Sequence, residues 1–164
     1  MGQKRRHKGI SFLVLISLFS CGNKEGFDEQ KAISKEGLTP KAIVFEVPAQ
    51  ELNNSPQNIF IWLRNNPEYE FSNIFLIATL KVNNEIYIQD TLEYAMTAPD
   101  GSWLGKGFTE LKENKLWWKE GLVIPQEGPV KIEIAQAMRN NGKPEGVPKL
   151  KGIVSLGISI EEQQ

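Results

Sequence analysis

The chain has 164 residues, with 19 Lys or Arg against 20 Asp or Glu, so its formal net charge is −1. Such a chain lacks the excess of positive charge by which proteins bind nucleic acid, and we predict no nucleic-acid partner. Its single histidine, His7, and single cysteine, Cys21, both lie near the N-terminus. The rest of the chain therefore excludes catalysis by His or Cys, zinc sites built on them and disulfide bonds.

The first 20 residues have the features of an export signal. Four basic residues and no acidic residue precede an apolar run over residues 10–19, which only Ser11 and Ser17 interrupt. A helix that spans a bilayer needs roughly 20 apolar residues, so this run fits the shorter core of a secretory signal peptide. We therefore predict that residues 1–20 form a cleaved signal peptide.

Residues 18–21, Leu-Phe-Ser-Cys, are similar to the lipobox of bacterial lipoproteins, in which the cysteine is acylated and the chain is cut before it. One acyl chain binds a membrane only marginally, whereas two or more, such as palmitate, hold a protein durably. We predict that Cys21 is the lipidation site and that the membrane is a partner. Cleavage would remove His7 and four of the 19 basic residues, which leaves a net charge near −5.

Residues 21–40 have few apolar side chains and no sustained period, so we predict a lipidated tether there and one domain over residues 41–164. Within that domain, apolar and polar side chains alternate over residues 43–47, 130–138 and 153–161. Alternation of this kind is typical of strands with one wet face. Residues 58–65 and 73–82 are nearly continuous apolar runs, which we interpret as central strands.

The best hairpin candidate joins residues 73–82 to residues 85–96 across Asn83 and Asn84. In its second strand, five large apolar residues are predicted to lie on one face: Ile86, Ile88, Leu92, Tyr94 and Met96. The charged residue Asp90 falls on the same face. Either a bulge turns Asp90 outward or its carboxylate meets buried partners.

Turn signals separate these segments, and the pattern predicts about seven to eight strands in an all-β fold. We predict an antiparallel β-sandwich of Greek-key or jelly-roll type, with a barrel as the alternative. Residues 109–114 are predicted to form one short helical turn.

Residues 98–125 hold three of the four tryptophans and a lysine between two glycines. The residues that we select as candidate contacts for a protein partner or a glycan are Trp103, Lys106, Trp117 and Trp118. The alternative is that this segment folds over the core and the rings cap it. If Trp117 and Trp118 lie in a strand, they point to opposite faces, so one of the pair is the better candidate for an exposed contact.

Carboxylates are the remaining groups that could act in catalysis, and lysines interleave with them in this segment as on an ordinary solvated surface. The spacing of Gly101, Gly105 and Gly107 around Lys106 does not fit a Walker A phosphate loop. We therefore predict no catalytic residue, no metal site and no cofactor.

Together, four stretches resemble the GldH family of gliding-motility lipoproteins. They are the lipobox ending at Cys21, "DTLEYAMTAPDGSWLGKGFTELKENKLWWKE" over residues 90–120, "EIAQAMRNNG" over residues 133–142 and "LKGIVSLGISIE" over residues 150–161. The resemblance implies a lipid-anchored, non-enzymatic envelope protein that is required for gliding and works beside the gliding motor and the secretion system. We expect it in the outer membrane. The alternative is a carbohydrate-binding sandwich that grips envelope glycan or surface polysaccharide.

Overall fold

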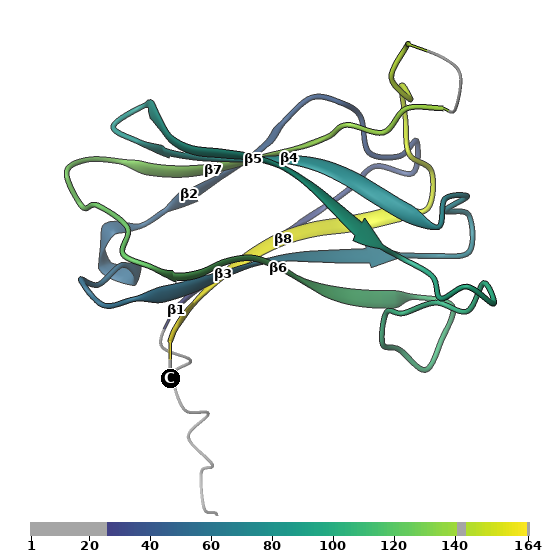
Figure 1. Ribbon diagram of the computed structural model, residues 1–164, viewed down its shortest axis with the longest axis horizontal. Helices are drawn as coiled ribbons and strands as arrows, with labels where there is room; N and C mark the ends of the chain where they lie inside the picture. The colour runs from purple at the N-terminus through teal and green to yellow at the C-terminus, as the bar shows by residue number, and fades with distance from the viewer. Residues whose placement is uncertain (1–25, 141–143, 164) are drawn as a thin grey trace, which may run out of the picture.

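The computed structural model describes residues 26–140 and 144–163, which form two antiparallel four-stranded sheets packed face to face. Figure 1 shows the two layers, with sheet 1 below and sheet 2 above. Sheet 1 has the order β1 (Gly26–Ala32), β8 (Ile153–Glu162), β3 (Gln57–Asn65) and β6 (Lys112–Leu122). Sheet 2 has the order β2 (Ile43–Val47), β7 (Val130–Gln136), β4 (Asn73–Val82) and β5 (Glu85–Ala95). The prediction of an all-β sandwich is confirmed.

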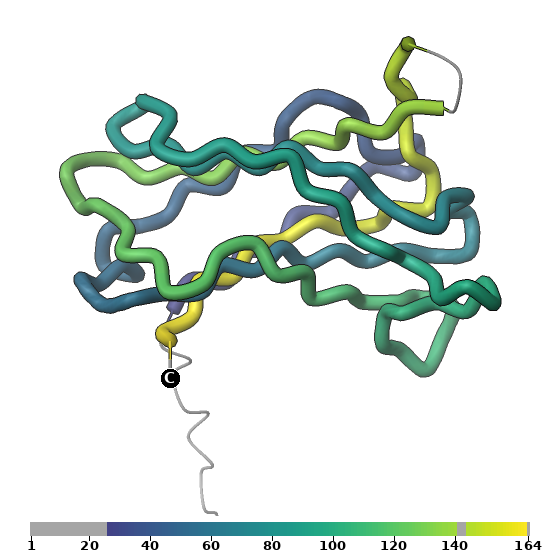
Figure 2. Tube along the Cα trace, viewed as in Figure 1, coloured from purple at the N-terminus to yellow at the C-terminus, as the bar shows by residue number. Residues whose placement is uncertain are grey.

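Most connections cross from one sheet to the other, as the tube in Figure 2 shows for β2 to β3, β3 to β4, β5 to β6 and β6 to β7. A short 3₁₀ turn, η1 (Ala49–Glu51), lies in the first of these connections. The crossings place β5 and β6 at the edges of their sheets, on the same side of the sandwich. As a result, the long segment between these two strands joins the two layers at their open edge.

The core lies between the sheets and is built from alternating residues of the four central strands. Ile59, Ile61 and Leu63 of β3 face inward, as do Leu76 and Leu80 of β4, and all are fully buried. Burying one such side chain contributes about 1.5–3 kcal/mol. The two nearly continuous apolar runs are thus central strands, as predicted: β3 lies between β8 and β6, and β4 between β7 and β5.

The hairpin between β4 and β5 forms at the predicted turn. Asn83 and Asn84 have φ angles of 52° and 65°. A two-residue turn with both central φ angles positive matches the twist of the flanking strands, and asparagine tolerates that conformation better than most residues. The turn is also held to sheet 2 by the Asn83 N–H, which donates to the Pro129 carbonyl at 2.9 Å.

One part of the predicted β5 pattern is wrong. Leu80 pairs with Ile88 but Lys81 pairs with Ile86, so Tyr87 is an extra residue in a β-bulge. Because of the bulge, Ile86 does not lie on the same face as Ile88, as strict alternation would predict. Both Ile86 (59% exposed) and Tyr87 (48% exposed) point outward. Asp90 lies beyond the bulge and keeps its inward parity, so the alternative in which it meets partners is the one the structure supports.

The predicted tether also differs from the structure. Gly26–Ala32 forms β1 and pairs residue by residue with β8, so the domain begins before residue 41. The sequence signal was weak because β1 is an edge strand that buries one large apolar side chain, Phe27. The predicted signal peptide and Cys21 lie outside the described residues.

β6 was not among the predicted strands, and the helical turn predicted over residues 109–114 is wrong. The structure has no helix at those described positions; residues 109–111 are irregular and β6 begins at Lys112. Its inward residues are Asn114, Leu116 and Trp118. Lysine and glutamate fill most other positions, which hides the strand pattern. Within the described ranges, no helix is long and apolar enough to cross a bilayer.

Candidate functional site

The segment between β5 and β6 first forms a small hairpin beside β5. Thr97 bridges Trp103, and the Ala98 N–H donates to the Ser102 carbonyl at 2.8 Å. At its turn, the Asp100 carboxylate accepts hydrogen bonds from the Ser102 N–H at 2.9 Å and the Ser102 hydroxyl at 2.6 Å. These bonds hold the pKa of the Asp100 carboxyl below its usual value. The turn is therefore fixed by its own side chains.

The segment then crosses to β6 and forms a second hairpin. Lys106 and Glu113 exchange two backbone hydrogen bonds of 2.8 Å, and the Lys112 ammonium donates to the Gly107 carbonyl at 2.7 Å. Gly107 has a φ of 155°, and a Cβ there would lie 2.2 Å from the Leu111 carbonyl oxygen. Only glycine fits this close approach. The hairpin tip presents Phe108, which is fully exposed, and Leu111, which is about half exposed.

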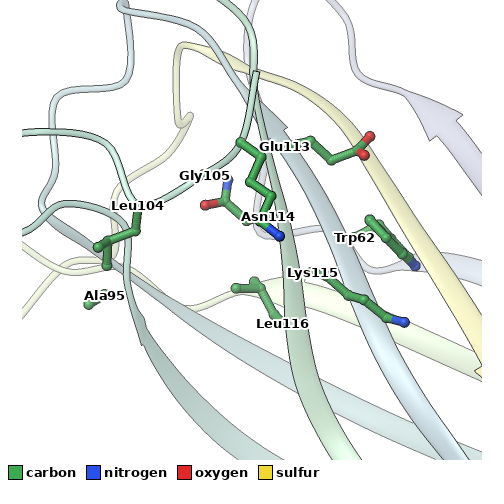
Figure 3. Close-up of a pocket in the computed structure, with 9 residues that line it drawn as sticks. Trp62, Ala95, Leu104, Gly105, Glu113, Asn114, Lys115 and Leu116 are labelled. Atoms are coloured by element: carbon green, nitrogen blue, oxygen red, sulfur yellow. The ribbon is translucent and has the colours of Figure 1, made fainter. Parts of the chain in front are cut away.

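Between the two hairpins and the edge of β6 lies a cleft of about 440 Å³. It is lined by Trp62, Ala95, Leu104, Gly105, Lys106, Glu113, Asn114, Lys115 and Leu116. Figure 3 shows Ala95 and Leu104 on one side of β6 and Trp62 and Lys115 on the other. We call this feature the β6 cleft. Its side toward the sheet interior is mainly apolar, and Lys106 supplies a positive charge.

A buried amide pair supports the floor of the β6 cleft. The Asn114 side-chain amide donates to the Leu63 carbonyl at 3.2 Å and to Asn65 Oδ1 at 3.0 Å, and both asparagines are buried. A Cβ at Gly105 would lie 2.8 Å from Asn114 Oδ1. The loop can therefore pack on this amide only if residue 105 is glycine. The position of Leu104 and Lys106 is thus set by contacts inside the fold.

Trp118 is a core residue that links the two sheets. Its side chain is 6% exposed, and its indole N–H donates to the Asp90 carboxylate at 2.9 Å. Lys119 pairs with the same carboxylate at 2.9 Å. Burial alone would raise the pKa of Asp90, but the hydrogen bonds from Lys119 and Trp118 and the Lys119 charge outweigh it and hold the pKa below its usual value. Asp90 is therefore charged and partnered at the interface between β5 and β6.

Trp117 points the opposite way, as expected for adjacent residues of a strand, and is 47% exposed. Its ring meets Phe60 of β3 edge to face, with centroids 4.6 Å apart and an interplanar angle of 88°. The Tyr94 hydroxyl donates to the Trp117 carbonyl at 2.6 Å. Burial, and next the charge of Asp90, raise the pKa of Tyr94 to about 12. Trp117 thus offers an indole face to solvent while its backbone is tied to β5.

Two further residues extend this outer surface. The Lys115 ammonium lies 3.8 Å from the Phe60 ring centroid and 5.3 Å from that of Trp62, and it pairs with Glu161 at 2.7 Å. The Trp62 indole N–H donates to the Ser159 hydroxyl at 2.8 Å. We call Phe60, Trp62 and Trp117 the outer aromatic face of sheet 1. Cation–π contacts and the ion pair keep Lys115 against this face.

The four candidate contacts do not converge on one site. Trp117 is on the outer aromatic face, Lys106 lines the β6 cleft, and Trp118 is in the core. Trp103 is half-buried and packs against Tyr69 with ring centroids 6.4 Å apart, so it covers one end of the core. Trp103 and Trp118 therefore follow the core-capping alternative.

Sequence reasoning missed Trp62 and the cleft residues Leu104 and Lys115. In the nearly continuous apolar run over residues 58–65, nothing distinguishes the outward position of Trp62 from its inward neighbours. The cleft depends on the path of the segment between β5 and β6. Gly105 and Gly107, on either side of Lys106, were the sequence signal for a tight path there. Among the described residues, no three His, Cys, Asp or Glu side chains come together as metal ligands do.

Comparison with known proteins gives a consistent result over nearly the whole chain. The profile of the family described as GldH lipoprotein matches residues 27–160. "Gliding motility lipoprotein GldH" of Flavobacterium johnsoniae is 39% identical over 96% of this chain and 98% of its own length. "Gliding motility lipoprotein GldH homolog" of Christiangramia forsetii is 41% identical over 92% of this chain and 93% of its own.

Among solved structures, the dimeric latent PorU from Porphyromonas gingivalis is similar over 85% of this chain and 13% of its own chain, with 10% identity and a TM-score of 0.32.

Proposed function

This chain belongs to the GldH lipoprotein family, and we propose that it is a non-catalytic component of the gliding apparatus. In this role it would bind other motility or secretion proteins. The family makes it a lipid-anchored protein of the cell envelope. The observation that carries the proposal is the match to gliding motility lipoproteins over nearly the full length of both chains. Cys21 is the proposed anchor and the outer membrane the proposed location.

The fold supports a role in binding away from the anchoring membrane. β1 begins at Gly26, five residues after Cys21, so an extended chain places the domain within about 17 Å of the anchor. Gly26 pairs with Glu161, so the anchored end is also the end where β8 finishes. In Figure 1 the end of β8 and the segment between β5 and β6 lie at opposite ends of the sandwich. The β6 cleft therefore lies toward the end of the domain that is far from the proposed anchor.

The far end also carries exposed apolar side chains. Phe108 is fully exposed at the tip of the second hairpin, and Leu104 and Leu111 are about half exposed beside it. Apolar side chains that cluster on a surface commonly mark a site of protein contact. Because this hairpin is fixed by the Lys106–Glu113 bonds, it can present these side chains without first becoming ordered.

A clean deletion of the gene tests the function directly. We expect the deletion strain to lose spreading over surfaces and the intact gene to restore it. A Cys21→Ala protein should leave the membrane fraction, whereas the matched variant Ser20→Ala, which keeps a small residue before the cysteine, should remain in it. Separation of the inner and outer membranes by density should place the intact protein in the outer one. Normal spreading after deletion would disprove the motility assignment.

A second candidate, binding of envelope glycan, is supported by the outer aromatic face. The half-exposed indole of Trp117, which packs edge to face on Phe60, offers the kind of flat ring on which sugars stack. Tryptophan fluorescence of the purified protein, titrated with a panel of envelope polysaccharides, tests this. We expect any response to disappear in Trp117→Ala and to persist in the Phe108→Ala control. An unchanged spectrum across the panel would exclude the glycan function.

A further inference from the structure

The free edge of β6 is occupied at two points and open between them. The Glu113 N–H and carbonyl bond to Lys106, and the Trp117 carbonyl accepts from Tyr94. In an antiparallel ladder every second residue directs both backbone groups to the same side, so those of Lys115 also point to the free side. Lys115 lines the β6 cleft, and no backbone bond joins it to another segment on that side among the described residues.

The side chain of Lys115 does not cover this open position. Its ammonium lies over the Phe60 ring and pairs with Glu161, both on the outer surface of sheet 1. Figure 3 shows the Lys115 side chain directed away from Leu104. Edge strands are usually blunted by charged side chains, bulges or covering loops, so an uncovered backbone position next to a cleft is a place for an added strand.

The cleft has the size and the lining for a short extended peptide. Its volume of about 440 Å³ is within the usual range of ligand pockets. Ala95, Leu104 and Leu116 give it an apolar side, where alternate side chains of an added strand would be buried. The N–H and carbonyl of Lys115 would supply the backbone hydrogen bonds.

The surroundings also fix the direction of such a strand. A chain running antiparallel to β6 would proceed from Trp117 toward Glu113, where Lys106 already occupies the next pairing position. The chain must therefore end there or turn away. A parallel chain would instead run away from Lys106.

Charge favours an end of the chain at this position. Lys106 lines the cleft and forms no ion pair with any described residue. A terminal carboxylate beside its ammonium would make a charge-assisted hydrogen bond, whereas the ammonium of a parallel chain's N-terminus would be repelled.

We infer that the β6 cleft binds the extended C-terminal segment of a partner protein, which adds as an antiparallel strand to β6 and places its carboxylate at Lys106. The inference rests on the proposed function and specifies how the partner is recognised. Affinity comes from the backbone of Lys115 and the apolar side of the cleft, and selectivity for a chain end comes from Lys106.

The test uses the full-length lipidated protein in the deletion strain, with a photoreactive amino acid in place of Leu104. After irradiation, the partner peptide joined to it is identified by mass spectrometry. We expect a peptide that contains the partner's C-terminus, and we expect none when the photoreactive residue replaces Val44 of β2 instead. A crosslink only to internal peptides, or no crosslink in cells that spread, would overturn the inference.

Two variants separate the backbone from the side chain. Lys115→Pro removes the N–H, which proline tolerates on the free side of an edge strand, whereas Lys115→Ala keeps it. We expect the crosslink to fall about tenfold further in Lys115→Pro than in Lys115→Ala, because only the proline variant loses a backbone hydrogen bond as well as the lysine side chain. Equal crosslinking by the two variants would contradict strand addition. Resistance to limited proteolysis checks that Lys115→Pro is folded.

Lys106→Gln tests the carboxylate even if Lys115→Pro does not fold. Synthetic peptides with the crosslinked C-terminal sequence are then compared with a free carboxylate and with an amide. We expect the free acid to bind the intact protein about tenfold more tightly, and Lys106→Gln to bind both equally, because only the lysine makes a charge-assisted hydrogen bond. No preference in the intact protein would disprove recognition of a chain end. A deletion strain that spreads normally would disprove the proposed function itself, whatever the peptides show.

Discussion

The edge strands of the two sheets are joined by different contacts on the two sides of the sandwich. On the β5–β6 side, Trp118 and Lys119 bond to the Asp90 carboxylate, and Tyr94 bonds to the Trp117 carbonyl. On the β1–β2 side, the Lys31 ammonium donates to the Val44 carbonyl at 2.6 Å and lies 5.0 Å from the Phe45 ring centroid. The first side uses a half-buried network, and the second uses one partly exposed lysine.

The contacts on the two sides differ because the β5–β6 side also supports a long connecting segment. The long segment between β5 and β6 forms the β6 cleft, and the bonds to Asp90 and from Tyr94 hold β6 in place beside it. Hydrogen bonds to a charged group contribute about 1.5–3 kcal/mol when they are shielded from water, whereas exposed ion pairs contribute about 0–1 kcal/mol. We therefore expect changes on the β5–β6 side to cost more stability and to reach the cleft.

The largest expected effect is that of Trp118→Ala. Removing a buried tryptophan leaves a cavity and costs about 3–5 kcal/mol of unfolding free energy. Urea denaturation of the purified protein measures the change. The matched control is Trp117→Ala, which removes a half-exposed ring that packs on Phe60 and should cost about 1 kcal/mol. Equal losses in the two variants would show that the inward and outward assignment of the pair is wrong.

Asp90→Asn should cost less, about 1–2 kcal/mol at pH 7, since the amide can still accept from Trp118 but no longer pairs as an anion with Lys119. The pKa of Asp90 is lowered on folding from an unfolded value of about 3.9. The charged carboxylate therefore stabilises the fold above that value, and this contribution is lost as the pH falls through the folded-state pKa. Urea denaturation at pH 7 and near pH 3 should show the difference between variant and parent shrinking. A difference independent of pH would contradict this.

Tyr94→Phe removes one hydrogen bond and should cost about 1 kcal/mol. The pKa of Tyr94 rises to about 12 in the folded protein from an unfolded value of about 10. The contribution of a raised pKa is complete below pH 10 and is lost as the pH rises toward 12. Absorbance of tyrosinate, followed together with denaturation from pH 9 to pH 12, should show one late-titrating tyrosine fewer in the variant. The same alkaline titration in both proteins would place the raised pKa elsewhere.

The sequence predicts those features of this side whose signal is local, and it does not predict features that depend on pairing with another strand. The Asn83–Asn84 turn was predictable because its signal is local: two asparagines can both adopt the positive φ that the turn requires. The opposite orientations of Trp117 and Trp118 follow from strand periodicity alone. The parity of Ile86 was not predictable, since a bulge at Tyr87 depends on pairing with β4.

The β6 cleft and β1 were beyond prediction for different reasons. The cleft exists because Lys106 returns to pair with Glu113, a contact across a loop that has no local periodic signal. β1 gains its place by pairing with β8, from the opposite end of the chain, while its own inward positions include Glu29 and Lys31. Inward charges are typical of protected edge strands, and they give the same composition as a tether.

The smallest expected effect, that of Lys31→Met, completes the comparison. Methionine keeps an unbranched apolar chain over Phe45 and removes the hydrogen bond to Val44 and the 3.2 Å ion pair with Glu29. Because the lysine is partly exposed, we expect a loss of about 0.5 kcal/mol or less, which added salt should reduce further. A loss as large as that of Asp90→Asn, measured in the same urea series, would show that the two sides are equally closed. A small loss would mean that β1 is held mainly by its backbone pairing with β8.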